Sequence, residues 1–184
     1  MSKFKKFSPE QIKQQKPSIN EVRKAERMPF YLILDNIRSL HNVGAIFRTA
    51  DAIMAKKLYL CGITGHPTNP PQKELSKTAL GALDVVPWEY LKSTLDVVKQ
   101  LKNAGITIYA LELTEKSVNY KKVDIKFPAA MIVGNEVDGI TEEVLDLADY
   151  AIDIPMKGRA NSLNVSTACG IAAFEFLYKY EQKT

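Results

Sequence analysis

The sequence contains few of the residues that build metal centres and disulfides: two cysteines, two histidines and one tryptophan in 184 residues. Cys61 and Cys169 lie far apart and outside any Cys-x-x-Cys pair, so we expect two buried free thiols. His41 and His66 lack the spacing of metal ligands, and no Ser/His/Asp or Cys/His arrangement suggests itself. We therefore expect no bound metal.

Long hydrophobic runs are also missing. No apolar run approaches the ~20 residues that a membrane-spanning helix needs. The first six residues include three lysines and lack the apolar stretch of a signal peptide. We therefore expect a cytoplasmic protein with no membrane partner.

The glycine patterns of the common nucleotide-binding folds are absent. No Gly-x-Gly-x-x-Gly motif follows the first predicted strand, and Gly62 and Gly65 lack the spacing and the Lys-Ser/Thr pair of a phosphate-binding loop. These absences argue against a P-loop enzyme. They also disfavour a nucleotide-binding α/β oxidoreductase, which is the alternative from another class.

Positive charge is concentrated at the N-terminus. The net charge is +4, and residues 1–27 hold eight Lys or Arg against three Glu, which leaves 17 basic and 18 acidic residues elsewhere. We therefore divide the chain into a basic N-terminal arm, residues 1–28, and a domain, residues 29–184. A basic arm on a near-neutral body suits a polyanion such as nucleic acid, and a solubilising tail is an equal alternative on charge alone.

Apolar runs alternate with helix-like segments after the arm. Runs bounded by turn residues predict strands near residues 30–34, 58–60, 106–113, 129–133 and 151–154. Helical periodicity or capping residues predict helices near 19–26, 43–50, 72–83, 93–103, 141–148 and 163–180. This alternation predicts an α/β domain with a mainly parallel sheet and helices on both faces.

Two polar segments follow predicted strands, where ligands bind in such sheets. In the first, Asn42 and Arg48 interrupt an apolar helical stretch; a helix N-cap and a surface arginine are the simpler explanations. In the second, Gly134 and Gly139 bracket a turn that contains Glu136. The glycines there either let a ligand touch the backbone or shape a plain turn.

A third polar segment follows the last predicted strand. It begins with Ile154-Pro155-Met156 and continues to Ser162-Leu163-Asn164-Val165-Ser166. Ser162 or Asn161 can cap the last helix. Helix propensity does not explain an asparagine inside that helix, which is where we place Asn164.

In this order, the three segments resemble the SpoU (TrmH-type) family of RNA ribose methyltransferases, part of the SPOUT superfamily. Members carry an Asn followed six positions later by Arg, a Gly-x-Glu-x-x-Gly turn, and Ile-Pro-Met followed by Ser-Leu-Asn-Val-Ser. The matching residues are Asn42 and Arg48, then Gly134, Glu136 and Gly139, then Ile154–Met156 and Ser162–Ser166. The resemblance covers about residues 30–180, with a further family-like segment at 77–86.

The resemblance implies an enzyme that methylates a ribose 2′-hydroxyl with S-adenosyl-L-methionine (AdoMet). It also implies a C-terminal deep trefoil knot, whose loops bind AdoMet. The expected cofactor-binding residues are Leu111, Glu112, Gly134, Ile154, Met156, Ser162 and Leu163. The expected catalytic residues are Arg48, Asn42, Glu136, Ser162 and Asn164.

The partners implied are RNA and a second copy of the chain. The homodimer follows from the resemblance, and the apolar residues around the last predicted helix suit either a dimer or burial within one subunit. The expected phosphate contacts are Arg38, Arg48, Lys157, Arg159, Lys5 and Lys6. The small size and N-terminal extension resemble tRNA-modifying members, so we favour tRNA over rRNA. An inactive RNA-binding homologue is disfavoured because every motif residue is present.

Overall fold

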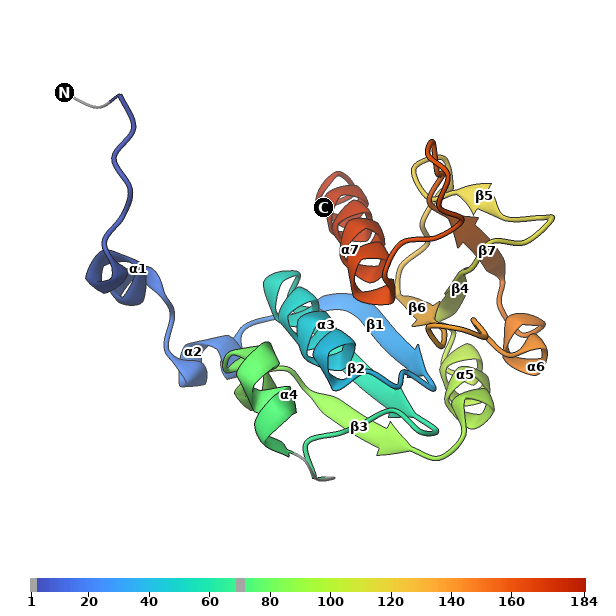
Figure 1. Ribbon diagram of the computed structural model, residues 1–184, viewed down its shortest axis with the longest axis horizontal. Helices are drawn as coiled ribbons and strands as arrows, with labels where there is room; N and C mark the ends of the chain where they lie inside the picture. The colour runs from blue at the N-terminus through green and yellow to red at the C-terminus, as the bar shows by residue number, and fades with distance from the viewer. Residues whose placement is uncertain (1–2, 69–71) are drawn as a thin grey trace.

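The computed structural model describes residues 3–68 and 72–184 and contains a seven-stranded sheet (Figure 1). The described strands all pair in parallel. The strands are β1 (Met28–Asp35), β2 (Ala55–Cys61), β3 (Trp88–Leu91), β4 (Thr107–Leu111), β5 (Val118–Asn119), β6 (Ala129–Val133) and β7 (Tyr150–Asp153). The predicted parallel α/β sheet is confirmed.

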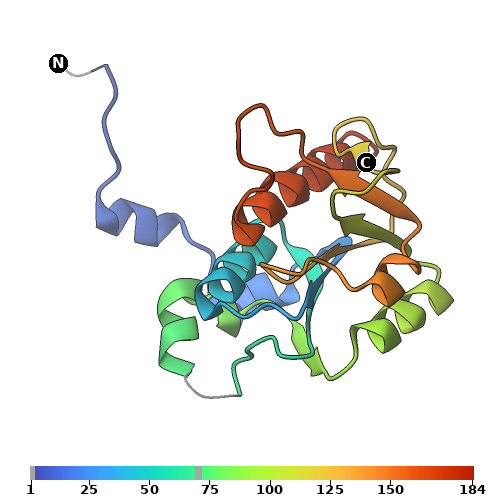
Figure 2. The ribbon, with the colours of Figure 1, turned by 45° about the vertical axis from the view of Figure 1, so that its right-hand side comes forward.

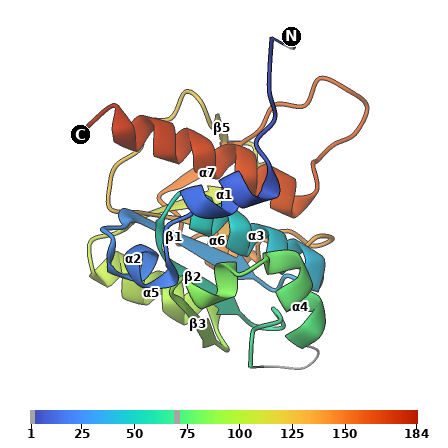
Figure 3. The same ribbon diagram turned by 90° about the vertical axis from the view of Figure 1, so that its left-hand side faces the viewer.

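Helices cover both faces of the sheet, as predicted, and Figure 3 shows the layers from the side. The helices packed on one face are α3 (Leu40–Ala52), α4 (Gln72–Ala79), the 3-10 helix η1 (Ala82–Asp84) and α7 (Val165–Glu181). The helices packed on the other face are α5 (Thr94–Asn103) and α6 (Glu142–Leu145). Each face thus has its own hydrophobic core.

The two cores follow from the alternation of side chains along the strands. Leu32 and Leu34 of β1 are buried with α3 and α7, whereas Ile33 between them is buried with α5. All five residues of β6 are buried, as expected of a strand covered on both faces. Ring contacts from Phe176 of α7 to Phe30 and Tyr109 join the last helix to the sheet.

The strand order brings distant parts of the chain together. Across the sheet the order is β3-β2-β1-β6-β4-β7-β5, so β6 lies between β1 and β4, and β7 lies between β4 and β5. The carboxyl ends of β1, β6, β4 and β7 are therefore neighbours, because parallel strands end at the same edge. All three polar segments of the sequence leave the sheet at this edge.

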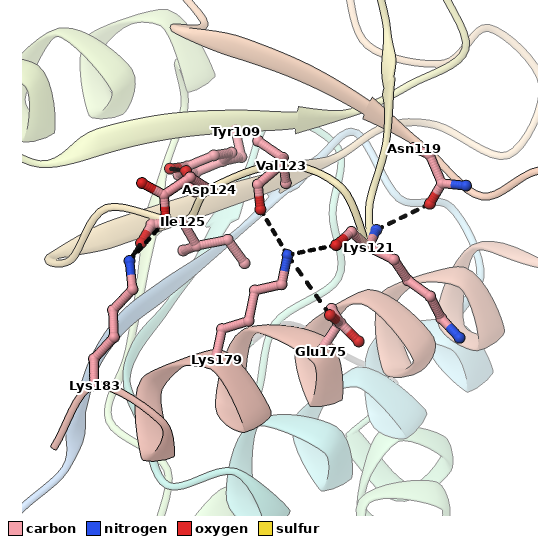
Figure 4. Close-up of polar contacts among 9 residues, drawn as sticks. All are labelled: Tyr109, Asn119, Lys121, Val123, Asp124, Ile125, Glu175, Lys179 and Lys183. Atoms are coloured by element: carbon pink, nitrogen blue, oxygen red, sulfur yellow. Dashed lines mark hydrogen bonds and ion pairs between the residues drawn. The ribbon is translucent and has the colours of Figure 1, made fainter.

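The last helix is fastened to the segment that follows β5 (Figure 4). Lys179 donates hydrogen bonds to the carbonyl oxygens of Lys121 and Val123, at 2.8 and 2.6 Å, and Lys183 donates to the carbonyl of Ile125 at 2.6 Å. Lys183 also pairs with the Asp124 carboxylate at 2.8 Å. These contacts hold the C-terminal end of α7 against the segment after β5, and the trefoil knot stays a prediction.

Three local features differ from the sequence expectations. The predicted helix over 72–83 is interrupted because Leu80 and Gly81 take positive φ angles, and η1 follows. The last helix starts at Val165, so Asn164 is its N-cap rather than an interior residue. β1 begins at Met28, the residue where we ended the arm.

The arm contains two short helices, α1 (Pro9–Gln15) and α2 (Ile19–Lys24), of which only the second was predicted. Each begins with a capping box, from Ser8 and Gln11 in α1 and from Ser18 and Glu21 in α2. Neither helix buries a residue, and α1 stands away from the body (Figures 1 and 2).

Cys61 and Cys169 are buried free thiols, as predicted. Burial raises the pKa of each thiol to about 12. In the part of the chain that the structure describes, no helix has the length and hydropathy to cross a membrane.

Candidate functional site

The Glu136 carboxylate joins the turn after β6 to the start of α3. Its two oxygens accept hydrogen bonds from the backbone N–H groups of Arg38 and Ser39, both at 3.0 Å, and from the Asn42 side-chain amide at 2.9 Å. Ser39 is the N-cap of α3 and accepts a hydrogen bond from the Asn42 N–H. The carboxylate thus lies at the N-terminus of a 13-residue helix, where the helix dipole favours negative charge.

This environment changes the acidity of Glu136. Desolvation raises its pKa, but the hydrogen bonds from Arg38, Asn42 and Ser39 together outweigh desolvation, so the pKa is lowered. The ionised form is favoured because those donors all bond to the charged carboxylate. Glu136 is therefore a fixed anion at neutral pH, although part of its side chain is exposed.

A second link connects α3 to the start of α7. The Asn164 amide nitrogen donates to the Asn42 side-chain oxygen at 3.0 Å. The Asn164 side-chain oxygen accepts from the Ser166 N–H at 3.0 Å, the Ser166 hydroxyl at 2.7 Å and the Thr167 N–H at 3.3 Å. Residues from all three sequence segments, Glu136, Asn42 and Asn164, therefore form one continuous hydrogen-bonded chain. The structure brings these three predicted residues together.

Asn135 is a buried contributor that the sequence analysis did not identify. Its side-chain amide donates to the Asn36 carbonyl at 2.7 Å, and its side-chain oxygen accepts from the N–H groups of Val137 and Asp138. It thereby fixes both the turn after β6 and the turn after β1. The sequence feature that could have identified Asn135 is an asparagine at the start of a polar turn, because Asn side chains form hydrogen bonds with backbone groups two residues later.

The two glycines of the second segment are required by the protein's own chain. A Cβ on Gly134 would collide with the backbone of Gly139 and Ile140. Gly139 has φ +69° and faces the Glu112 carboxylate, which accepts from the Ile140 N–H at 3.0 Å. Glu112 therefore ties the segment after β4 to the turn after β6. Leu111, the last residue of β4, is half-buried beside it.

Arg48 is exposed on α3, six residues after Asn42. Its guanidinium makes no hydrogen bond or ion pair with any described residue, unlike Asn42, Glu136 and Asn164. Its neighbour Thr49 lies 3.7 Å from the position of a Cβ on Gly170, where α3 packs on α7. The helix that carries Arg48 is thus held at both ends.

The loop between β7 and α7 carries the rest of the third segment. Ile154, Met156 and Leu163 are half-buried, while Ser162 is exposed and joins no hydrogen bond within the described chain. The backbone groups of residues 154–163 also make no hydrogen bond to described residues. The loop therefore offers apolar side chains together with free N–H and C=O groups.

The predicted phosphate-binding residues are all exposed but do not form one cluster. Arg38 is 3.9 Å from Asp138, with side chains 62% and 73% exposed, so this ion pair contributes little to stability. Lys157 and Arg159 lie in the loop after β7. Lys5 and Lys6 precede α1, and Figure 1 shows α1 and the segment before it apart from the ends of β1 and β6.

A cavity of about 350 Å³ lies beside this site rather than in it. It is lined by Thr114, Glu115, Lys116, Leu145, Ala148 and Ala151, from the segment after β4, from α6 and the turn that follows it, and from β7. None of the predicted site residues lines it. Three motif residues, Glu136, Asn42 and Asn164, are instead connected to one another by hydrogen bonds.

Comparisons with known proteins agree on one family. The model of the SpoU rRNA Methylase family matches residues 29–174. The chain is 34% identical over 165 residues to the tRNA (guanosine(18)-2′-O)-methyltransferase of Aquifex aeolicus, covering 90% of this chain and 76% of that protein.

Two crystal structures share the fold. The TrmH/SpoU tRNA modifying enzyme of A. aeolicus has a TM-score of 0.79 at 34% identity, covering 90% of this chain and 82% of that one. The AdoMet-bound rRNA methyltransferase of Sinorhizobium meliloti has a TM-score of 0.74 at 32% identity, covering 84% of this chain and 58% of that one.

Replacing Glu136 with glutamine should weaken the fold in a pH-dependent way. Because the folded-state pKa of Glu136 is lowered, its contribution is present above the unfolded carboxyl pKa, about 4.3, and is lost as pH falls through the folded value. We expect Glu136→Gln to reduce the free energy of unfolding by about 1 kcal/mol at pH 7. Urea unfolding at pH 7 and pH 3.5 measures the free energy of unfolding, with Glu115→Gln as the control. An equal loss of stability at both pH values contradicts the stabilising role of the Glu136 carboxylate.

Proposed function

This chain belongs to the SpoU rRNA methylase family, and we propose that it transfers the methyl group of AdoMet to a ribose 2′-hydroxyl of tRNA. The observation that carries this proposal is the hydrogen-bonded chain Glu136–Asn42–Asn164, which unites the three family segments at one edge of the sheet. The A. aeolicus relative, which acts on tRNA guanosine 18, supports tRNA as the substrate.

The residues of the strand-end loops fit AdoMet. An adenosine needs apolar contact for its ring faces and backbone groups for its polar edges. Ile154, Met156 and Leu163 offer half-buried apolar side chains, and the backbone of residues 154–163 has unpaired donors and acceptors. These residues, with Leu111 and the backbone at Gly134, would hold the cofactor. Glu112 and Ser162 stay candidate cofactor-binding residues: the Glu112 carboxylate also positions the Ile140 N–H, and Ser162 is exposed beside Leu163.

When bound, AdoMet supplies a methyl group already activated by a positively charged sulfur. The chain's own residues must hold the ribose oxygen about 3–3.5 Å from that carbon and in line with it. A guanidinium stays protonated at neutral pH, so we assign Arg48 to hold the target phosphate and to stabilise the developing alkoxide. As the ribose oxygen gains the methyl group, its proton passes to solvent water, because the Arg48 guanidinium already carries its full set of protons. Asn42 and Glu136 fix the helix from which Arg48 extends.

A second substrate class has its own support. The S. meliloti structure at 32% identity is an rRNA methyltransferase, so rRNA is the alternative substrate for the same chemistry. We favour tRNA because the A. aeolicus relative is of similar length, with 76% of it covered, whereas only 58% of the rRNA enzyme is covered. We also place the reaction in the cytoplasm.

We propose a homodimer formed through α7. Cys169, Ala172, Ala173 and Phe176 face the core of their own subunit. Ile171, Phe174 and Tyr178, spaced three and four residues apart on the same helix, stay 37%, 51% and 58% exposed. This stripe is the surface that a second copy would cover.

Replacing Arg48 with alanine should nearly eliminate methyl transfer and leave AdoMet binding intact. Removal of one electrostatic stabiliser costs about 10²–10³-fold in turnover. Nucleoside mass spectrometry of tRNA and rRNA incubated with AdoMet measures the product, and calorimetry measures AdoMet binding. Lys99→Ala, on the far face of the sheet, is the control. Normal turnover by Arg48→Ala removes Arg48 from the mechanism, and methylation of rRNA alone overturns the tRNA assignment.

A lysine at position 174 should separate the dimer. Phe174→Lys places a charge in the exposed stripe, where burial of an unpaired charge is costly. Light scattering should report a monomer, while circular dichroism stays unchanged. Gln182→Lys, which introduces the same side chain at the C-cap of α7, should stay dimeric. A monomeric wild-type protein contradicts the dimer.

Removal of residues 1–16 should weaken RNA binding more than cofactor binding. This truncation deletes α1 and five lysines but keeps α2 and every residue of the body. We expect a higher KM for RNA, an unchanged KM for AdoMet, and a smaller salt dependence of RNA binding, because fewer counterions are released. Steady-state kinetics at two salt concentrations measures this. An unchanged KM for RNA refutes a role for the arm.

A further inference from the structure

Two arginines near the end of the arm direct their hydrogen bonds into the body. Arg23 donates from Nε and Nη2 to the Asp84 carbonyl, at 2.9 and 2.6 Å. Arg27 donates from Nη1 to the Ala55 carbonyl at 3.1 Å and from Nη2 to the Val85 carbonyl at 2.5 Å. Four hydrogen bonds from two arginines, four residues apart in the chain, therefore converge where η1 ends and β2 begins.

The acceptors are suited to guanidinium groups. Asp84 is the last residue of η1 and Val85 its C-cap, and carbonyls at a helix end lack intrahelical donors and attract positive charge. Arg27 is only 9% exposed, so its guanidinium is taken up by these contacts. Removing those acceptors would leave a buried charge unpaired, which is unfavourable enough to hold the contact in place.

The lysines at the start of the arm, unlike Arg23 and Arg27, do not direct their side chains to acceptors among the described residues of the body. Those in α1 and the flanking residues are Lys3, Lys5, Lys6, Lys13 and Lys16, and all are exposed. None forms an ion pair with a described residue. The Lys3 ammonium lies over the Phe4 ring, 5.6 Å from its centroid. The basic residues of the arm therefore fall into two groups, arginines that bond the body and lysines without an ion-pair partner in the described part of the body.

We propose that Arg23 and Arg27 are positioning residues that latch α2 to the body, so that the lysines ahead of it meet the phosphate backbone of the RNA substrate outside the methyl-transfer site. This inference rests on the proposed RNA-binding function of the arm. It assigns phosphate contact to the lysines and denies it to the two arginines, although all carry the same charge.

The latch has a thermodynamic consequence that separates it from phosphate contact. Without the latch, the arm is mobile in the free protein and must be ordered when RNA binds. Loss of the latch therefore weakens RNA affinity through the conformational entropy that binding removes. That entropy does not depend on salt. Loss of a phosphate contact instead reduces the slope of log K against log salt by about 0.9 for duplex or about 0.7 for single-stranded nucleic acid.

The latch is tested first in the free protein. Spin labels on Asn20→Cys in α2 and Lys99→Cys in α5 report the distance between arm and body, because both sites are exposed and the native thiols are buried with raised pKa values. With labelled subunits diluted into excess unlabelled protein, so that each dimer holds one labelled pair, we expect one narrow distance distribution, which Arg23→Gln and Arg27→Lys broaden. Lys24→Gln, which removes a neighbouring charge from the same helix, should leave it narrow. A broad distribution in the otherwise unchanged protein overturns the proposal.

RNA binding then tests the consequence, with full-length protein and tRNA at several salt concentrations. We expect Arg23→Gln to raise Kd by about three- to tenfold with an unchanged salt slope. The double variant Lys5→Gln/Lys6→Gln should lower the slope by about 1.4 to 1.8. A slope reduced by Arg23→Gln, or an unchanged Kd, overturns the positioning role. An unchanged slope in the lysine variant instead overturns RNA binding by these lysines, while the spin-label distances still decide the latch.

Discussion

The arrangement of the site depends on one carboxylate bound to the first turn of α3. Glu136 accepts from two backbone N–H groups and one side-chain amide, so it fixes the turn after β6 against the turn after β1. Asn42 passes this constraint to Asn164, and Asn164 caps α7. Asn42 and Asn164 each use both the nitrogen and the oxygen of the side-chain amide in these hydrogen bonds, which sets the orientation of each amide. A single anion thereby determines where α3 and α7 begin relative to one another.

This chain of contacts exists only because of the strand order. Glu136 and Asn42 are 94 residues apart, and Asn42 and Asn164 are 122 apart. They meet because β6 is placed directly beside β1, and because α7 returns from β7 to pack on α3. If the strands lay in the sheet in the order of the sequence, the end of β1 would be far from the end of β6. The topology is therefore the condition for the site, and local helix and strand preferences are secondary.

The sequence alone predicted what depends on local pattern. The apolar runs at β1 and β6 are buried on both faces, and this burial makes them readable as strands of a covered parallel sheet. The motif spacing identified Asn42, Glu136 and Asn164, but it placed Asn164 inside α7, since a capping bond to Ser166 cannot be read without the chain geometry. The capping box from Ser8 to Gln11 was readable and was missed, as was the turn role of Asn135. Contacts between segments needed the strand order, which no local pattern encodes.

The polar residues of this molecule divide by where their hydrogen bonds end. Asn42, Glu136 and Asn164 bond to other parts of the chain, and so do Arg23 and Arg27. Arg48 and the lysines in and around α1 have no such partner among the described residues and are exposed. A satisfied polar group holds geometry, whereas an exposed cation keeps its donors for a ligand. The same distinction explains why Arg23 and Lys5, two basic residues of the same arm, have different roles. It also assigns substrate contact to the cations that form no hydrogen bond or ion pair with described residues.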